Sequence, residues 1–364
     1  MKISDIIAAI EDVAPLSLQE KYDNAGLQIG NKKNEATGAL LCIDVTEDII
    51  DEAVENGINL VISHHPLLFK GLKNITGKNY VERAVIKAIR NDIAVYAAHT
   101  NLDNAVGGVN YKIAEELGLG NVSILQPSEG KLLKLVTFVP EADASRVREA
   151  LFAAGSGHIG NYDRCSYNMS GYGTFRAGEG ADPYCGEIGL EHHEEEERIE
   201  VIFPEYLKTG LMKRLLEVHP YEEPAYDIIR LENSWKGAGS GVVGELLSPM
   251  DETDFLEMVK SVFHCGVIKY SNLLGGKVQR VALCGGSGSF LMPDAVAAGA
   301  DAFITGEIGY HDYFSAEEQI LLVEAGHYET EQYTKDIFCD IITKKFPNFA
   351  VRYTKVGTNP INYL

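Results

Sequence analysis

The sequence lacks several features that would mark whole classes of protein. None of its six cysteines forms a Cys-x-x-Cys pair, which excludes the zinc and redox motifs built on that spacing. No apolar run approaches the roughly 20 residues that span a bilayer, and the N-terminus has no signal-peptide apolar segment. We therefore expect a cytoplasmic protein with reduced thiols and no membrane partner.

Basic residues are also scarce. The chain has 32 Lys and Arg against 53 Asp and Glu, which gives a formal net charge of −21 at pH 7. A surface of this sign repels phosphate backbones, so nucleic acid is not an expected partner. Cations are the natural ligands, and an anionic small molecule such as a nucleotide would need bound metal ions to reverse the local charge.

The pattern of apolar residues predicts an α/β host domain with parallel or mixed sheets flanked by helices. From residue 38 onward, apolar runs of strand length alternate with amphipathic stretches of helix length, as in parallel β-α-β units. The predicted strands are residues 38–44, 59–63, 93–98, 281–284, 302–305, 320–324 and 350–353. The clearest predicted helices are residues 47–56, 80–90 and 330–345.

Between these two flanks the order of elements changes to β-α-β-β-α-β, the order of ferredoxin-like α+β modules. The strands are expected at residues 132–139, 164–170, 199–203 and 225–231, and the helices at residues 144–154 and 206–218. A polar, Gly-containing stretch at residues 232–239 is interpreted as a linker. We predict an inserted ferredoxin-like domain of residues 128–234 in a host of residues 1–127 and 235–364, with the insertion point in the helix-rich stretch after Asp103.

Histidine and carboxylate side chains follow three of the predicted host strands. His64 and His65 come directly after the strand at residues 59–63, and His99 and Asp103 follow the next strand. Ligand sites in α/β proteins gather at the carboxyl ends of parallel strands. A lone histidine in such a place is more often a hydrogen-bonded structural residue, so the argument depends on the whole set.

The side chains after the third of these strands strengthen the case for a metal site. His327 and Glu331 are four residues apart at the start of the helix after residues 320–324, so they share one helical face. We expect the side chains that follow these three strands to lie at one sheet edge and to hold two divalent ions, with Asp103 as a bridge and free positions for water. Nitrogen and oxygen donors without thiolate suit Zn, Fe, Mn or Co, and zinc is our first expectation.

Three motifs in this order resemble those of the Nif-three-like family of dinuclear metal-binding proteins, whose members are often labelled GTP cyclohydrolase 1 type 2 homologues. They are Ser-His-His-Pro at residues 63–66, His-Thr-Asn-Leu-Asp at 99–103 and Gly-His-Tyr-x-Thr-Glu at 326–331, and residues 22–30 also match an early family motif. Many members have Trp where this chain has Tyr22. The resemblance implies the metal ligands His64, His65, Asp103, His327 and Glu331, and leaves His99 as a supporting residue.

The inserted segment resembles the module of the longer bacterial members, most clearly at residues 219–226 (His-Pro-Tyr-Glu-Glu-Pro-Ala-Tyr). That module is similar to trimeric ferredoxin-like signalling and metal-tolerance proteins. The resemblance implies self-association into a ring-shaped homohexamer, which composition and spacing do not show.

Three weaker signals each have two interpretations. The glycine-rich segment at residues 285–289 is either a phosphate cradle or a tight βα turn. Glu307 and His311, four residues apart, are candidates for a supporting or general acid/base pair on a helix, or for a surface ion pair. The His-His-Glu-Glu-Glu-Glu run at residues 192–197 has a metal-like composition, but we interpret it as a solvated acidic loop.

Two functions remain open from the sequence. The first is a metal-dependent hydrolase, in which two cations activate water for GTP ring opening or for hydrolysis of a phosphoester. The alternative is a non-enzymatic metal-binding or regulatory protein whose insertion senses a small ligand.

Overall fold

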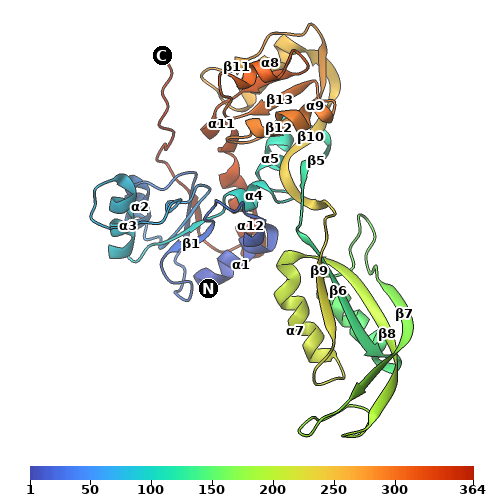
Figure 1. The fold of residues 1–364 in the computed structure, drawn as a ribbon. Coiled ribbons are helices and arrows are strands. Elements are labelled where there is room, and N and C mark those ends of the chain that lie inside the picture. The colour runs from blue at the N-terminus through green and yellow to red at the C-terminus, as the bar shows by residue number, and fades with distance from the viewer. The chain divides into compact units, whose positions relative to one another are not determined.

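The computed structural model describes residues 1–364, which form two compact units (Figure 1). The host unit comprises Met1–Pro127 and Gly237–Leu364, and the inserted unit comprises Ser128–Lys236. None of the helices combines the length and the apolar character needed to cross a lipid bilayer.

The first sheet of the host unit is mostly parallel. Its strands, in spatial order, are β1 (Gly26–Ile29), β4 (Ala94–Ala97), β3 (Leu60–Ser63), β2 (Ala39–Cys42) and β15 (Val351–Tyr353). Only β1 is antiparallel to its neighbour. The accompanying helices are α1 (Ile3–Val13), α2 (Glu47–Glu55), α3 (Tyr80–Arg90) and α12 (Thr334–Lys345). The predicted β-α-β order is confirmed here.

The helices of this sheet follow from local sequence. Asn79 begins α3, and its side-chain oxygen accepts a hydrogen bond from the amide of Glu82 at 2.9 Å. Apolar residues at helical spacing, including Ile49, Ile50 and Ala53 of α2, are buried against the strands. The strands themselves are apolar on both faces, as expected for a sheet covered on both sides.

The second sheet of the host unit is mixed. Its strands, in spatial order, are β11 (Lys269–Tyr270), β14 (Leu321–Glu324), β13 (Ala302–Thr305), β12 (Lys277–Cys284), β10 (Trp235–Asp251) and β5 (Gly120–Ser128). β12, β13 and β14 are parallel, while β10 and β11 run antiparallel to their partners. The remaining helices of the unit are α4 (Thr100–Asp103), α5 (Val109–Glu116), α8 (Glu252–Val262), α9 (Met292–Ala297), α10 (Asp312–Ser315) and α11 (His327–Glu331).

Three expectations about the host were wrong. The three strand ends that carry the metal-type residues, expected at one sheet edge, belong to two sheets, because β14 pairs with β13 and β11 while β3 and β4 lie in the first sheet. The inserted unit interrupts the chain between the neighbouring strands β5 and β10, and not in the helical stretch after Asp103. The residues expected as a linker, 232–239, include the start of β10, whose glycines fit an extended strand as well as a loop.

The inserted unit has the predicted ferredoxin-like order of elements. They are β6 (Leu132–Pro140), α6 (Glu141–Ala153), β7 (Tyr167–Arg176), β8 (Glu191–Pro204), α7 (Lys208–Val218) and β9 (Tyr226–Arg230). The sheet is antiparallel throughout, in the order β7-β8-β6-β9. Its core is made by apolar residues of β6, β8, α6 and α7.

The prediction of a solvated loop at residues 192–197 was wrong. These residues belong to β8 and pair with β7, for example His192 with Phe175 and Glu194 with Gly173. His192, Glu194 and Glu196 are half-buried. The run gave no strand signal in the sequence because its half-buried face is polar, so apolar and polar residues do not alternate.

Candidate metal centre

The first sheet supplies four of the expected side chains at the ends of two adjacent parallel strands. His64 and His65 follow β3 directly, and their amides continue the strand pairing by donating to the carbonyls of Cys42 and Ile43. His99 lies just after β4, and Asp103 ends the short helix α4. His64 is completely buried, so its position is fixed by the packed ends of the strands.

The second sheet supplies the other two side chains from the end of β14. Gly326 has a φ of +96°, a backbone conformation that glycine adopts freely, and it turns the chain from the strand into α11. His327 begins this helix and Glu331 ends it, so both lie on one face. Glu331 is only 3% exposed.

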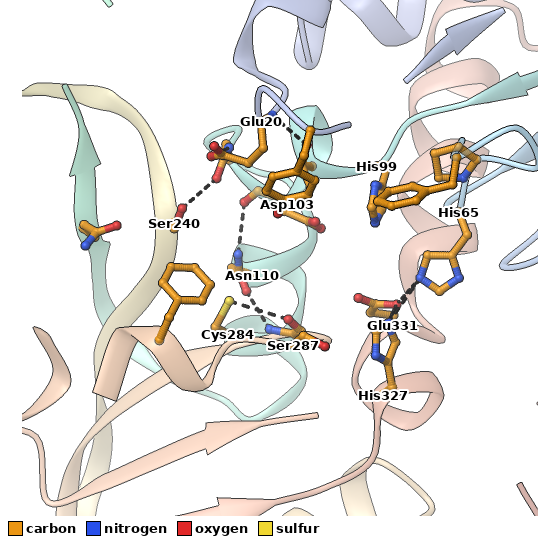
Figure 2. Close-up of a pocket in the computed structure, with 18 residues that line it drawn as sticks. Glu20, His65, His99, Asp103, Asn110, Ser240, Cys284, Ser287, His327 and Glu331 are labelled. Carbon is orange, nitrogen blue, oxygen red and sulfur yellow. Dashed lines mark hydrogen bonds and ion pairs between the residues drawn. The ribbon is translucent and has the colours of Figure 1, made fainter. Parts of the chain in front are cut away.

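The side chains from the two sheets converge on Glu331 (Figure 2). Its Oε2 lies 2.9 Å from His65 Nε2 and 3.3 Å from His327 Nε2. Its Oε1 lies 3.5 Å from His64 Nε2, and Asp103 Oδ1 is 3.7 Å from the same nitrogen. The expected single sheet edge is therefore replaced by the ends of two sheets, and Glu331 lies between the Nε2 atoms of His64, His65 and His327.

Each imidazole is held through its Nδ1 atom, so that Nε2 is directed into the centre. The partners of Nδ1 are the Ala98 carbonyl for His64 (3.0 Å), Asp44 for His65 (2.7 Å), Asp23 for His99 (2.8 Å) and Glu307 for His327 (3.0 Å). A carbonyl only accepts, so Nδ1 of His64 donates its proton and the lone pair of the neutral ring is on Nε2. Metal-binding histidines are typically oriented in this way.

One buried atom, Nε2 of His64, indicates that the arrangement fits a metal ion. Nε2 of His64 is buried and has no hydrogen-bond partner, although carboxylate oxygens surround it. Buried polar atoms in proteins are almost always satisfied, so an orphaned lone pair indicates a missing ligand. Donor atoms of two sets lie within 4.8 Å of one another, namely those of His64, His65 and His99, and those of His65, His327 and Glu331. His99, expected as a supporting residue, thus places a donor atom near those of His64 and His65.

Charges in the cluster are strongly coupled. Burial favours the neutral form of His65, but hydrogen bonds to Asp44 and Glu331 outweigh it and raise the pKa of His65 to about 10. Burial likewise opposes the charge of His327, yet Glu331 raises the pKa of His327 to about 9. Burial also opposes the charge of Glu331, and the surrounding imidazoles hold its pKa well below the usual value. Without a metal, protons on the imidazoles balance this carboxylate.

A cavity of about 670 Å³ opens beside the cluster. The carboxylates of Glu20, Asp103 and Glu331 line it, and no Lys or Arg does. The thiol of Cys284 also lines it, but burial strongly raises the pKa of this thiol and keeps it neutral. Nitrogen and oxygen atoms are therefore the available donors.

The other predicted residues have different outcomes. Glu307 hydrogen bonds Nδ1 of His327 and the Ser287 hydroxyl, which makes it a positioning residue. The predicted helical pair of Glu307 with His311 was wrong, because residues 306–309 are not helical and the His311 ring contacts Tyr310 and Phe314 instead.

The glycine-rich segment at residues 285–289 behaves as a tight turn. The amides of Gly285, Gly286 and Gly288 donate to side chains of the protein, namely Asn110, Thr330 and Thr305. These amides are not free to hold a phosphate. Gly286 is required for another reason: its φ is +61°, and a Cβ at this position would lie 2.3 Å from Glu331 Oε1.

Sequence reasoning missed the role of two carboxylates. Asp44 follows β2 and holds His65, and Thr358 near the C-terminus donates to its other oxygen at 3.0 Å. Asp23 holds His99 and accepts from the amide of Thr100. Asp44 could have been found from its place after a strand of the same sheet, whereas Asp23 comes from a loop with no periodic signal.

Comparisons with known proteins agree over the whole chain. The family model described as Duf34/NIF3 (NGG1p interacting factor 3) matches residues 1–360. A Halalkalibacterium halodurans protein named GTP cyclohydrolase 1 type 2 homolog is 37% identical, with 100% of both chains covered. A Bacillus subtilis protein of the same name is 35% identical, with 99% of this chain and 98% of its own covered.

Solved structures give the same result. The crystal structure of a Bacillus cereus protein related to NIF3 has a TM-score of 0.85 and 36% identity, and covers 100% of this chain and 99% of its own. A Staphylococcus aureus protein has a TM-score of 0.78 and 30% identity at the same coverage. The chain therefore belongs to the Duf34/NIF3 family.

Proposed function

We propose that the chain is a metal-dependent hydrolase with a dinuclear divalent-metal site. The proposed ligands are His64, His65, Asp103, His327 and Glu331. The observation that carries the proposal is the position of Glu331, whose two oxygens face different imidazoles while each ring is held through Nδ1. A carboxylate with this surrounding is suited to bridge two cations.

The donor set limits which metals fit. Imidazole and carboxylate donors suit Zn, Fe, Mn and Co, and zinc is our first choice. When bound, two such cations supply an activated water at neutral pH and polarise the phosphoryl group or ring carbon that it attacks. Asp44, Asp23 and Glu307 fix the imidazoles, so the donor atoms are in place before substrate arrives.

The cavity suggests the class of substrate. The aromatic side chains of Tyr22, Phe69 and Phe290 line it and are more than 40% exposed, so their faces are available to a planar base. Because no Lys or Arg lines the cavity, a phosphate could be accepted only where bound cations neutralise it. We therefore propose a nucleotide or another phosphoester, which agrees with the name of the curated relatives, GTP cyclohydrolase 1 type 2 homolog.

The test is turnover by the full chain loaded separately with Zn, Fe, Mn or Co. GTP and a panel of phosphoesters should include at least one substrate, and Glu331→Gln should abolish its turnover. His193→Ala, which changes an exposed histidine of the inserted unit, should not alter the rate. If no metal form of the wild-type protein turns over any of these compounds, hydrolase function is wrong.

A second candidate function is favoured by a cavity in the inserted unit. It has a volume of about 470 Å³, and Phe175, Tyr184 and Tyr221 are among its lining residues. Such a cavity is large enough for a small-molecule ligand. A regulatory protein would change its metal affinity when a ligand binds there, and Tyr221→Ala would remove that response without changing the affinity measured in the absence of ligand.

We also propose that the chain self-associates as a homohexamer. The support is the family resemblance of the inserted unit, and the measurement is native mass spectrometry of the purified chain. A monomer at micromolar concentration would rule this proposal out.

A further inference from the structure

The inserted unit contains a second cluster of metal-type side chains, distinct from the centre in the host unit. His192 and Glu194 lie two residues apart on β8, so they project from the same face of the strand. Both are half-buried, while the intervening His193 is exposed. The segment between β7 and β8, residues 177–190, brings Cys185 to this face.

The donor atoms of the three side chains converge. Cys185 Sγ, a His192 ring nitrogen and a Glu194 oxygen all lie within 4.8 Å of one another. Ligand atoms that lie roughly 2.0–2.3 Å from a tetrahedral zinc ion are about 3.3–3.8 Å from one another. The three donor atoms are therefore grouped on the scale of a single metal site.

The local contacts hold the cluster together. Nε2 of His192 lies 2.7 Å from Glu194 Oε2, and the Cys185 thiol is hydrogen bonded to Glu194. Gly186 has a φ of +81°, and a Cβ there would lie 2.9 Å from His192 Cβ, so the loop approaches the strand as closely as a glycine allows. A larger residue at this position would push Cys185 away from the strand.

The charge of the cluster also favours a cation. Glu194 forms no ion pair with Lys or Arg, and Glu196 lies two residues further along β8 on the same face. A divalent ion would balance the charge of Glu194 and release the proton of the Cys185 thiol on binding.

We propose that Cys185, His192 and Glu194 bind one transition-metal ion in the inserted unit. Thiolate, imidazole and carboxylate together suit zinc or cobalt and leave one tetrahedral position open. This site does not depend on the hydrolase function of the host unit, because the two sets of ligands belong to different units.

Cobalt(II) provides a test that separates the two sites in the full chain. None of the proposed ligands in the host unit is a thiolate, so a thiolate-to-cobalt charge-transfer band in the near ultraviolet reports only on the inserted unit. We expect this band to appear on titration of the wild-type protein and to be absent from Cys185→Ser. His192→Ala and Glu194→Gln should each weaken the cobalt binding that produces the band by more than about 100-fold. This loss exceeds the roughly 10–100-fold that follows when a metal ligand loses its hydrogen-bond partner.

His193→Ala is the matched control, because its side chain is exposed and stacks on Tyr172, away from the cluster. It should retain the band and the wild-type affinity. Circular dichroism of each variant verifies that the inserted unit is folded, and Glu194→Gln tests the site even if Cys185→Ser unfolds. A wild-type protein without the band, a band that survives in Cys185→Ser, or equal loss in His193→Ala would overturn the proposal.

Discussion

Glu331→Gln should remove most of the stabilisation that metal ions give to the host unit. The substituted side chain keeps the shape of Glu331 but lacks the charge that lies between His64, His65 and His327. Metal at about 1,000 times its dissociation constant stabilises a folded protein by about 4 kcal/mol. For a unit of roughly 250 residues, about 4 kcal/mol corresponds to a rise of roughly 8–16 °C in the unfolding temperature.

The assay is differential scanning calorimetry of metal-loaded and metal-free protein. Wild-type protein should show the full rise in the unfolding temperature of the host unit, and Glu331→Gln should show only a small part of it. The metal-free variant should also unfold at a lower temperature than metal-free wild-type protein, because His65 and His327 lose the carboxylate that stabilises their charged forms. His311→Ala, an exposed residue of the same unit, is the control and should show the full rise.

Two results would refute this reasoning. A wild-type protein whose host transition does not move on metal loading has no metal centre of the proposed strength. An equal rise in Glu331→Gln and wild-type protein would mean that the metal binds elsewhere.

Three further predictions follow from the surroundings of the centre. Asp44→Asn should weaken metal binding by about 10–100-fold, because the amide no longer fixes His65 as a carboxylate does. Competitive titration with a chromophoric chelator measures the metal affinity, and an unchanged affinity would contradict the role assigned to Asp44. Gly286→Ala should destabilise the chain by at least about 1–2 kcal/mol, since alanine is strained at positive φ and its methyl group would press on Glu331. Urea unfolding measures the free energy of unfolding, and a variant as stable as the wild-type protein would contradict this prediction. Although burial opposes its charge, hydrogen bonds from His99 and Thr100 and the charge of His99 lower the pKa of Asp23 from the ordinary value of 3.8 to about 2. As the pH falls, the unfolded chain therefore binds the proton first. Asp23 should therefore contribute about 2 kcal/mol of stability above pH 4 that disappears as the pH falls to 2, and Asp23→Asn should lose this pH dependence in acid unfolding.

The sequence predicted those parts of the fold that depend on local periodicity. Apolar runs located β2, β3, β4, β13 and β14 to within a residue or two. The ends of β3, β4 and β14 then gave the candidate residues of the centre, since ligands in α/β proteins gather at such ends.

Other features depend on contacts between distant segments, which periodicity does not report. The pairing of β14 with β13 and β11, which separates His327 from the first sheet, is such a case. The helix predicted at residues 330–345 is divided into α11 and α12 by a turn at residues 332–333. Residues 191–198 of β8 were missed because half-buried carboxylates and histidines hide the alternation of a strand.

The most direct test of the dinuclear centre is anomalous diffraction from crystals of protein purified without added metal. Data collected on both sides of the Zn, Fe, Mn and Co absorption edges count the ions and identify them together. We predict two peaks beside Glu331, one within reach of His64 and the other within reach of His65 and His327, at a separation of about 3.5–4 Å. A single peak, or no peak near Glu331 in protein that contains metal, would contradict the account.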